Sequence, residues 1–397
     1  MNGLEQDLAR WMPRLIGAWR SLGRHPGGPR DALAPAELRT AAAGVRRLSA
    51  GLTRDRTLAG AAYMDDPQLL GAYLLFYWPI SYAQGRQVLG ELDHRARSAL
   101  DLGSGPAPLA FAALDAGAAE AIAADRSRRA LALARALAGD AGEGLATREW
   151  SPGTRGAALD ARLCAPERRF DVIAFGHLLN ELFGAGEAAL ARRAALVEEA
   201  LGRLRPDGSV VIIEPALRET SRALLQLRDV LVARGYAVRA PCFYRGNCPA
   251  LLKQSDWCHA ERVWRRPPLV EAIARAAGLH RESLKMSYLV LAPRGEAWSD
   301  PPPGRVFRIV SEPLQGKGRQ RFIGCGPEGR LGLALQDKHR TGGNESFFGL
   351  QRGDVARISE AEPRGDGLSL GAASQVSVIA TAGQPVPRSR PSEINSR

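Results

Sequence analysis

The feature that most constrains the fold is a glycine-rich loop between a short apolar strand and a helix. We expect the strand over residues 98–102 and the helix over 108–116, and between them the chain reads Gly103-Ser104-Gly105-Pro106. Short apolar runs and Ala-rich helical stretches then alternate as far as residue 291. Strands that alternate with helices of this length predict a parallel, doubly wound sheet with right-handed crossovers. We therefore expect an α/β, Rossmann-like core.

The alternation sets the expected elements of the core. Strands are expected over 121–124, 170–175, 209–213 and 286–291, and helices over 127–138, 187–204 and 217–234. Ahead of the core, Leu4, Leu8, Trp11, Leu15 and Trp19 recur at spacings of three and four, which is typical of one face of a helix. A second helical stretch is expected over 31–58. The apolar run 69–78 predicts a buried helix that ends at Pro79.

Changes in composition divide the chain. We expect an N-terminal helical region over 1–95 and a core over 96–300 that contains an irregular, cysteine-rich insertion over 240–266. Short, glycine-punctuated strands at 306–310, 321–325, 331–335 and 354–358 then predict a small β-barrel over 301–362. The rest of the chain, 363–397, is rich in Gly, Ser, Pro and Ala, and this composition predicts a disordered tail.

The glycine loop also predicts a ligand. Ligands of doubly wound sheets lie outside the carboxyl ends of the strands, and glycines let the backbone come close to them. Asp125 follows Gly105 by twenty residues at the end of the second strand, where an acid can accept ribose hydroxyls. Pro108 stands where a dinucleotide fingerprint has its third glycine, and Asp101 suits an amine better than a pyrophosphate. We therefore favour S-adenosylmethionine over a dinucleotide or an empty fold. The candidate cofactor-binding residues are Asp101, Gly103, Ser104, Gly105, Pro106 and Asp125.

The strand expected over 170–175 is followed by polar residues that would face an acceptor. His177 is a candidate general base, and Asn180 and Glu181 are candidates for handling the acceptor. A structural histidine and helix-capping residues are the competing interpretations. The Asn/Asp-Pro-Pro-aromatic motif of amino-group methyltransferases is absent, so catalysis stays open.

Three of the five cysteines, Cys242, Cys248 and Cys258, fall within 17 residues, and such clustering indicates metal or redox chemistry. A fourth ligand is needed, and His259, Cys325 and Cys164 are the candidates. The spacing is not that of a zinc ribbon, whereas iron–sulfur clusters tolerate looser spacing. An iron–sulfur cluster, zinc and unmetallated thiols all remain open. Radical S-adenosylmethionine chemistry is disfavoured because no Cys-x3-Cys-x2-Cys motif is present.

The net charge of +12 and the isoelectric point near 10.1 favour a polyanionic partner such as nucleic acid. The competing explanation is the arginine and alanine bias of a GC-rich genome, since the chain has only four lysines. No apolar run approaches the 18 or more residues of a membrane span, and the N-terminus lacks the features of a signal peptide. We therefore expect a cytoplasmic protein without membrane contact, and a monomer.

Taken together, these motifs resemble a family of small-ribosomal-subunit-associated, methyltransferase-like proteins of bacteria and mitochondria. The matching stretches are Asp101 to Pro106, Leu179-Asn180-Glu181-Leu182, Ile213-Glu214-Pro215, Pro241-Cys242, Cys248-Pro249, Trp257-Cys258-His259 and Cys325. They cover roughly residues 60 to 330 in order, and the cysteine pattern is the most specific part.

The resemblance implies a class I methyltransferase fold, an S-adenosylmethionine pocket and a role on ribosomal RNA in small-subunit assembly. It also implies a 4Fe–4S cluster held by Cys242, Cys248, Cys258 and Cys325. The chain departs from the family at Ala107, where a glycine is usual, and at Cys242-Phe243-Tyr244, where Cys-Pro-His is usual. The leading hypothesis is a ribosome-assembly factor with slow or lost methyl transfer. The alternative is an active RNA methyltransferase with a structural zinc or iron–sulfur site.

Overall fold

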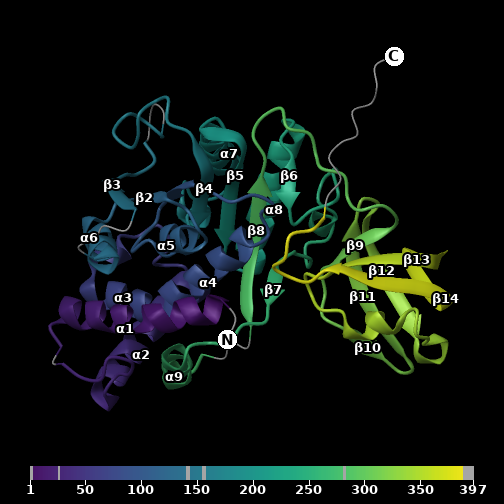
Figure 1. Ribbon diagram of the computed structural model, residues 1–397, viewed down its shortest axis with the longest axis horizontal. Helices are drawn as coiled ribbons and strands as arrows, with labels where there is room; N and C mark the ends of the chain where they lie inside the picture. Colours follow the sequence, from purple (N-terminus) through teal and green to yellow (C-terminus); the bar gives the residue numbers. More distant parts are fainter. Residues whose placement is uncertain (1–2, 26, 140–143, 154–157, 280–282, 388–397) are drawn as a thin grey trace.

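A large mixed sheet lies beside a smaller closed one in the computed structural model (Figure 1). The structure describes residues 3–25, 27–139, 144–153, 158–279 and 283–387. N-terminal helices pack along one end of the large sheet, and the small sheet lies at the opposite end of the molecule (Figure 1).

The large sheet has the strand order β3-β2-β1-β4-β5-β8-β6, with β7 paired to β8. The strands are β1 Ser98–Leu102, β2 Glu120–Asp125, β3 Leu145–Glu149, β4 Phe170–Gly176, β5 Leu204–Glu214, β6 Val238–Ala240, β7 Ala260–Arg262 and β8 Leu284–Leu291. The first five strands are parallel, which confirms the doubly wound α/β core. β8 runs antiparallel to both β5 and β6. The strand order reverses between β1 and β4, and ligands of such sheets lie there.

Helices cover both faces of this sheet. They are α5 Pro108–Asp115, α6 Arg128–Ala138, α7 Glu187–Leu201 and α8 Arg218–Ala233. Helix α9 Pro268–Ala277 packs against the N-terminal helical region instead. The expected helices of the core agree with α5 to α8 to within three residues at each end. The edge strand β3, the short strands β6 and β7 and helix α9 were not expected; β7 lies inside the insertion that was expected to be irregular and pairs with β8. β3 reads Leu-Ala-Thr-Arg-Glu and is half-exposed, so it lacks the apolar run that identifies a buried strand.

The N-terminal region is helical, as predicted. It contains α1 Gly3–Gly23, α2 Pro35–Ser49, α3 Pro67–Ala72 and α4 Trp78–Leu89, with the short turns η1 Ala50–Arg54, η2 Tyr63–Asp65 and η3 Tyr73–Tyr77. The apolar face of α1 is buried: the Trp11 ring lies 5.2 Å from that of Trp78 and 4.6 Å from that of Phe111 on α5. The N-terminal helices therefore share one hydrophobic layer with the core.

The buried apolar helix does not end at Pro79. It continues to Leu89 because Pro79 lies in the first turn of α4, directly after the π-helical turn η3. A proline in the first turn gives up an N–H group that would have no helical partner there, so the helix tolerates it.

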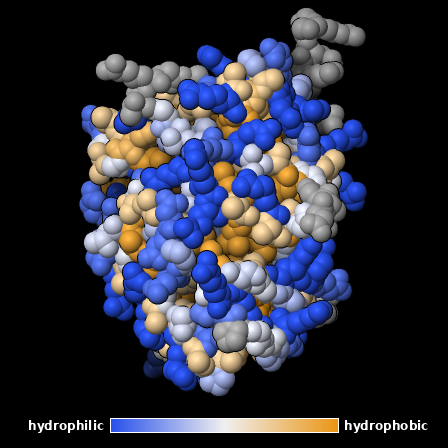
Figure 2. All heavy atoms as spheres, turned by 90° about the vertical axis from the view of Figure 1, so that its left-hand side faces the viewer, coloured by the Kyte–Doolittle hydropathy of each residue, from blue (hydrophilic) through white to orange (hydrophobic). Residues whose placement is uncertain are grey.

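No helix among the described residues is long and apolar enough to cross a membrane. Hydrophilic side chains cover much of the face at the core end, with apolar atoms between them (Figure 2).

The C-terminal strands form a closed sheet, which we call the C-terminal β unit. They are β9 Val306–Ile309, β10 Leu314–Gly316, β11 Arg319–Gly326, β12 Gly329–Gln336, β13 Val355–Arg364 and β14 Gly367–Ala380. β9 pairs with both β13 and β11, so the sheet closes on itself. Phe307, Phe322, Leu333, Leu335 and Phe347 fill its interior.

The expectation of a disordered tail from residue 363 is wrong. β13 extends to Arg364, and β14 covers Gly367–Ala380. The Gly, Ser and Ala content hid the alternation of β14, in which Leu368, Leu370 and Val376 point into the closed sheet. Residues 388–397 of the expected tail lie outside the described part.

A buried ion network joins the core to the C-terminal β unit. The Glu91 carboxylate after α4 lies 2.6 Å from the Arg262 guanidinium of β7 and 3.9 Å from that of Arg308 on β9. Tyr288 Oη donates to Glu91 Oε2 at 2.6 Å. The side chains of Glu91 and Arg262 are each 2% exposed. We call these residues the junction network.

Candidate functional site

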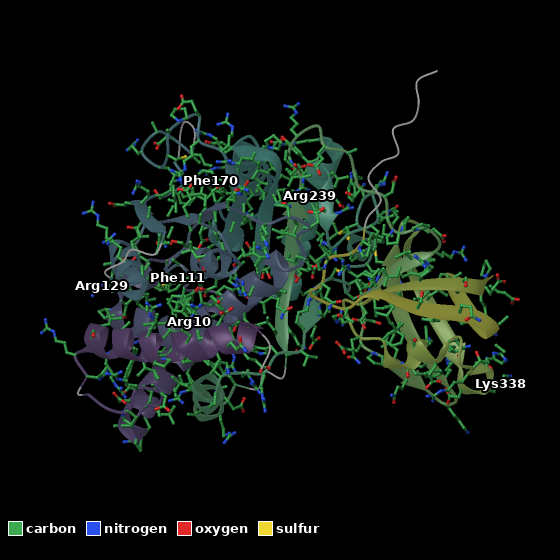
Figure 3. All side chains as sticks on the ribbon, in the orientation of Figure 1. Arg10, Phe111, Arg129, Phe170, Arg239 and Lys338 are labelled. Carbon is green, nitrogen blue, oxygen red and sulfur yellow. The ribbon has the colours of Figure 1, made fainter. Side chains whose placement is uncertain are left out.

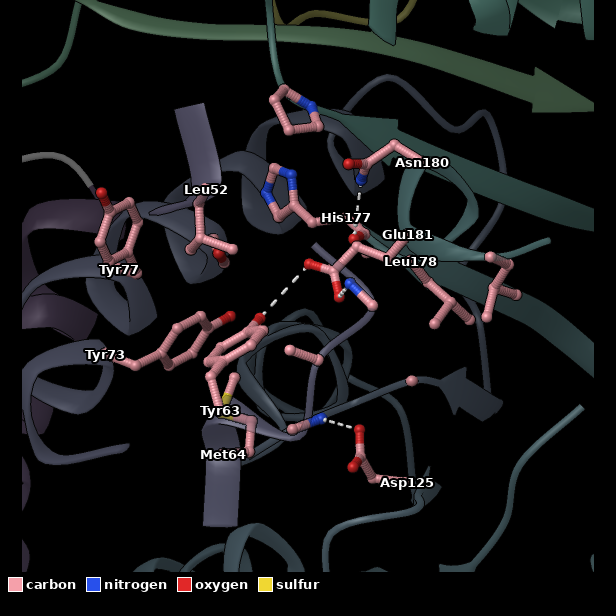
Figure 4. A pocket seen from close by; sticks show the side chains of 18 of the residues that line it. Leu52, Tyr63, Met64, Tyr73, Tyr77, Asp125, His177, Leu178, Asn180 and Glu181 are labelled. Atoms are coloured by element: carbon pink, nitrogen blue, oxygen red, sulfur yellow. Dashed lines mark hydrogen bonds between the residues drawn. The ribbon is translucent and has the colours of Figure 1, made fainter. Parts of the chain in front are cut away.

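A pocket of about 940 Å³ opens at the carboxyl ends of β1 and β4, where the strand order reverses. Its wall includes the glycine loop after β1, the end of β2, the segment after β4 and residues of the N-terminal region (Figure 4). A pocket of this size and position is typical of a small-molecule or cofactor site.

Two glycines of the loop face this pocket with positive φ angles, 67° at Gly103 and 53° at Gly105. A Cβ at Gly103 would lie 2.5 Å from the Leu178 side chain, and one at Gly105 would lie 3.2 Å from Met64 Cε. Both positions therefore favour glycine through the backbone conformation and through close neighbours.

Asp125 lies at the end of β2 on the pocket wall. Its Oδ2 accepts from the Gly105 amide at 2.8 Å (Figure 4), and its Oδ1 accepts from the Ser127 amide at 2.7 Å. The side chain is almost fully buried, and burial raises the pKa of its carboxyl above the ordinary value. Each carboxylate oxygen can accept a second hydrogen bond, as ribose hydroxyls would require.

The remaining loop residues lie behind this wall. The Asp101 carboxylate is 2% exposed and accepts from the Ala110 amide of α5 at 3.0 Å, and burial raises its pKa to about 8. Asp101 thus caps α5 and lines an inner void, whereas a bound amine had been expected beside it. Ser104 is buried, and the Pro106 carbonyl accepts from Trp78 Nε1 at 2.9 Å.

Ala107, where the family usually has glycine, lies outside the pocket. Its φ of 62° is in the left-handed region, and its methyl group is fully buried in the core beside α5. It does not line the pocket, so it does not crowd a cofactor. The usual glycine at this position suits the left-handed backbone instead.

The structure brings His177, Asn180 and Glu181 to the pocket, and it gives them different environments. His177 Nε2 lies 2.8 Å from Gln84 Oε1. The Asn180 amide group donates to Glu214 Oε2 at 2.5 Å and to the His177 carbonyl at 2.9 Å, and its Oδ1 accepts from Arg56 at 2.8 Å. Both amide hydrogens of Asn180 are therefore used within the protein, and they are not free to hold an acceptor.

Glu181 faces the pocket, and burial raises the pKa of its carboxyl to about 7. Its Oε2 accepts from the Gly60 amide at 3.2 Å, and Tyr63 Oη donates to its Oε1 at 3.5 Å (Figure 4). A carboxyl with a pKa near 7 can accept or release a proton under physiological conditions. The Glu181 carboxyl therefore has an acid–base range that suits proton transfer near neutral pH.

Sequence reasoning missed the segment that covers the pocket. We call residues 56–65 the covering segment: it is held to the loop after β4 by Arg56 and Gly60 and lies against the glycine loop through Met64. Arg126 Nη2 donates to the Gly60 carbonyl at 2.9 Å. Tyr63, Tyr73 and Tyr77 add an aromatic wall on the same side. No periodic pattern marks this segment, so only its tertiary position reveals it.

Glu214 at the end of β5 was also missed as a site residue. It is 2% exposed, and burial raises the pKa of its carboxyl to about 8. Its position directly before Pro215, at a strand end beside β4, was the available signal.

The four clustered cysteines line a second, smaller cavity of about 70 Å³, which we call the thiol cavity. They come from separate places: Cys242 follows β6, Cys248 precedes the turn η5 Pro249–Leu251, Cys258 precedes β7, and Cys325 lies on β11. Cys164 is buried in another part of the core, and His259 lines the thiol cavity.

Electrostatics in the thiol cavity disfavour free thiolates. Burial and neighbouring thiolates raise the pKa of Cys248 to about 12 and that of Cys258 to about 11. Burial and the same neighbours raise the pKa of Cys325 further. Burial also lowers the pKa of His259 to about 4. Among the described residues, no group of three or more Cys, His, Asp and Glu side chains is arranged to hold a metal ion.

Residues 69–355 match the family model described as "Mitochondrial small ribosomal subunit Rsm22". No curated protein matches the chain.

Three similar solved structures are methyltransferases. Ribosomal protein L11 methylase from Lactobacillus delbrueckii subsp. bulgaricus is 15% identical, with a TM-score of 0.31 over 54% of this chain and 77% of that one. An O-methyltransferase family protein from Burkholderia thailandensis is 16% identical, with a TM-score of 0.39 over 67% and 75%. A methyltransferase from Pyrococcus furiosus is 14% identical, with a TM-score of 0.33 over 53% and 81%. The family match covers more than two thirds of the chain, and the protein therefore belongs to the Rsm22 family of the small ribosomal subunit.

Proposed function

We propose that this chain binds S-adenosylmethionine and acts with small-subunit ribosomal RNA in ribosome assembly or translation. The observation that carries the cofactor assignment is the pocket at the β1–β4 switch point, where Gly103, Gly105 and Asp125 share one wall. The ribosomal assignment rests on the family match, and the net charge of +12 supports a polyanionic partner.

Co-sedimentation tests the ribosomal part. The purified full-length protein is mixed with small subunits and separated on a sucrose gradient. We expect it to migrate with the subunits at low salt and to dissociate as salt rises, because phosphate contacts release counterions. A protein that stays at the top of the gradient at every salt concentration would contradict the proposal.

We further propose that Cys242, Cys248, Cys258 and Cys325 hold a 4Fe–4S cluster. All four thiols line one cavity without a carboxylate ligand, and this soft donor set suits iron–sulfur or zinc. The cysteine pattern shared with the family is what favours a cluster over zinc here. Bound metal would offset the mutual repulsion of the thiolates.

Anaerobic purification followed by iron, sulfide and zinc analysis tests this assignment. We expect about four iron and four sulfide per chain, and loss of both in Cys325→Ser. The matched control is Cys164→Ser, because Cys164 is also buried but lies outside the thiol cavity. Stoichiometric zinc without sulfide would show that the site holds zinc in place of a cluster. A folded protein without metal would contradict both assignments.

The alternative function, an active RNA methyltransferase, rests on Glu181. Its carboxyl faces the pocket with a pKa of about 7. Incorporation of labelled methyl groups into small-subunit RNA, abolished in Glu181→Gln, would support this alternative. Without incorporation, the assembly role stands alone.

We propose that the chain acts as a monomer in the compartment of the ribosome that it serves. The family description names the mitochondrial small subunit, while the sequence-based expectation was the cytoplasm. Imaging of the tagged protein beside small-subunit markers decides between the two.

A further inference from the structure

The C-terminal β unit has a specific strand order. Starting from β9, the closed sheet runs β9-β11-β12-β14-β13 and returns to β9. All neighbours are antiparallel except β12 and β14, which are parallel. Without the extra hairpin strand β10, these are five strands in the order first, second, third, fifth, fourth. That order, with the third and fifth strands parallel, is the topology of the OB-fold.

The interior of the closed sheet is packed as this topology requires. Phe322 on β11 lies edge-on to Phe347 of η7 Glu345–Gly349, with ring centroids 5.2 Å apart. This turn lies between β12 and β13 and contributes to the interior of the closed sheet. The interior is therefore occupied by side chains, and any ligand must lie on the outer face. OB-folds bind oligonucleotides and oligosaccharides on the face of their second and third strands.

The second and third strands here are β11 and β12, and alternation assigns their outer face. Phe322 and Leu333 point inward, so Arg319, Arg321 and Ile323 on β11 point outward. On β12 the outward positions facing them are Gln336, Ala334 and Gly332. These three are small or uncharged, so the basic side chains of β11 border a shallow surface.

One end of this face is covered by the core. Arg330 Nη1 donates to Asp256 Oδ2 at 2.7 Å, and Gly329 lies against Tyr244. Cys325, which pairs with Arg330, belongs to the thiol cavity at the same end. The free part of the face is therefore the end that carries Arg319 and Arg321.

The free end gathers positive charge. Lys317 in the β10–β11 turn, Arg319, Arg321 and Lys338 are all exposed, and no carboxylate partner for them is found among the described residues. The Asp337 amide donates to the Gly318 carbonyl at 3.0 Å, which brings Lys338 beside that turn. Lys338 lies at the outer end of the C-terminal β unit, far from the core (Figure 3). We call these four residues the basic corner.

We propose that the outer face of β11 and β12, with the basic corner, binds single-stranded RNA through its phosphates. Four cations without carboxylate partners suit a polyanion better than a neutral oligosaccharide. The outward residues of β11 and β12 include no aromatic ring, so bases have no stacking surface there and recognition is expected to be independent of sequence. The exposed carboxylates of Glu360 and Glu362 on β13, beyond β14, mark the edge of the proposed RNA-binding face. This inference rests on the proposed association with ribosomal RNA and deepens it.

Fluorescence anisotropy with a labelled oligouridylate of about 16 nucleotides tests the proposal, since OB-folds occupy about 4–16 nucleotides. The test variant is the triple substitution Lys317→Ala, Arg319→Ala and Arg321→Ala in the full-length chain. We expect at least about tenfold weaker binding, and a salt dependence shallower by about 2 in log–log slope, because single strands lose about 0.7 per phosphate contact. Unchanged thermal melting verifies that the variant is folded.

The matched control removes the same charge elsewhere, by Arg39→Ala, Arg129→Ala and Arg162→Ala. These side chains are exposed, and Arg129 lies at the opposite end of the molecule (Figure 3). We expect less than about a twofold loss there, since long-range charge alone is screened. Equal losses in both triple variants would overturn the proposal, as would tighter binding of an RNA duplex than of the single strand. If the wild type co-sediments with small subunits but does not bind the oligonucleotide, this inference fails while the proposed function stands.

Discussion

The pocket and the thiol cavity are built in opposite ways. The glycine-loop wall of the pocket comes from one strand–loop–helix unit and the strand after it, with Asp125 only twenty residues after Gly105, and the covering segment closes over it. The thiol cavity collects side chains from the core and from β11, so Cys242 and Cys325 are 83 residues apart in the chain. A local motif can specify that wall of the pocket. The thiol cavity exists only if the core and the C-terminal β unit stay together.

Removing a charge from the junction network should disturb the thiol cavity and leave the pocket intact. Glu91→Gln removes the carboxylate between Arg262 and Arg308, whose side chains are 2% and 6% exposed. We expect the free energy of unfolding to fall by about 3–5 kcal/mol, because buried guanidinium groups lose their partner. Urea denaturation measures this change.

The control for this prediction is Glu328→Gln, since Glu328 pairs with Arg305 on the surface. We expect it to change the free energy of unfolding by less than about 1 kcal/mol. Equal effects of the two variants would show that the junction network does not hold the two parts together.

The second prediction concerns the carboxyl groups behind the pocket. The pKa of Glu214 is about 8 in the folded protein and near 4.5 ordinarily. Below about pH 4.5 the group is protonated in both states. As pH rises, the unfolded chain loses this proton first, so stability falls between pH 4.5 and 8 and then stays low. Glu214→Gln should reduce that fall by about 4 kcal/mol between pH 5 and pH 8.5.

Urea titrations at pH 5 and pH 8.5 measure this difference, and the exposed Glu219 provides the control variant Glu219→Gln. Wild type and Glu219→Gln should share one pH dependence, and Glu214→Gln should be flatter. If all three proteins lose the same stability, ionisation of the buried Glu214 carboxyl does not cause the loss of stability at high pH.

The third prediction sharpens the role of the covering segment. Arg56→Ala removes its bond to Asn180 Oδ1 at 2.8 Å. A hydrogen bond to a charged group contributes about 1.5 kcal/mol, so we expect S-adenosylmethionine to dissociate about tenfold faster. Stopped-flow displacement measures the rate. Arg54→Ala, two residues earlier and exposed, should leave it unchanged, and equal rates in wild type and Arg56→Ala would remove the covering role.

The smallest effect is expected at Ala107. Ala107→Gly relieves a left-handed alanine, at φ 62°, but adds entropy to the unfolded chain. We expect the loss of the buried methyl group to offset most of the relieved strain, so the free energy of unfolding should change by less than about 0.5 kcal/mol. Ala110→Gly within α5 should instead lose about 1 kcal/mol. Thermal melts compare the two, and similar losses in both would show that the left-handed backbone is not strained.

The sequence predicts those parts of the molecule that local patterns specify, and it misses those that depend on contacts between distant residues. The strand at 98–102, the loop and the helix after it form a local pattern, and the structure has them where they were expected. β14 was missed because its buried residues, Leu368 and Leu370, lie among glycines, serines and alanines. Alternation in such a strand is visible only beside its partners.

The site was predictable where a residue acts through its position on a strand end. Asp125 lies on the pocket wall, but Asp101 turns inward to cap α5, and no sequence pattern distinguishes these two carboxylates. The use of both Asn180 amide hydrogens depends on Glu214, which is 34 residues later. Tyr63 and Met64 reach the pocket only because the covering segment folds across it.

Calorimetric titration of S-adenosylmethionine into the full-length, anaerobically purified protein tests the central claim most directly. We expect binding with a stoichiometry of one in wild type and in Glu149→Ala, whose exposed carboxylate pairs in register with Asp125 on the neighbouring strand. Asp125→Ala should weaken binding at least about thirtyfold, since it removes hydrogen bonds to a charged group. No binding heat in the folded wild type, or equal affinity in both variants, would contradict the account.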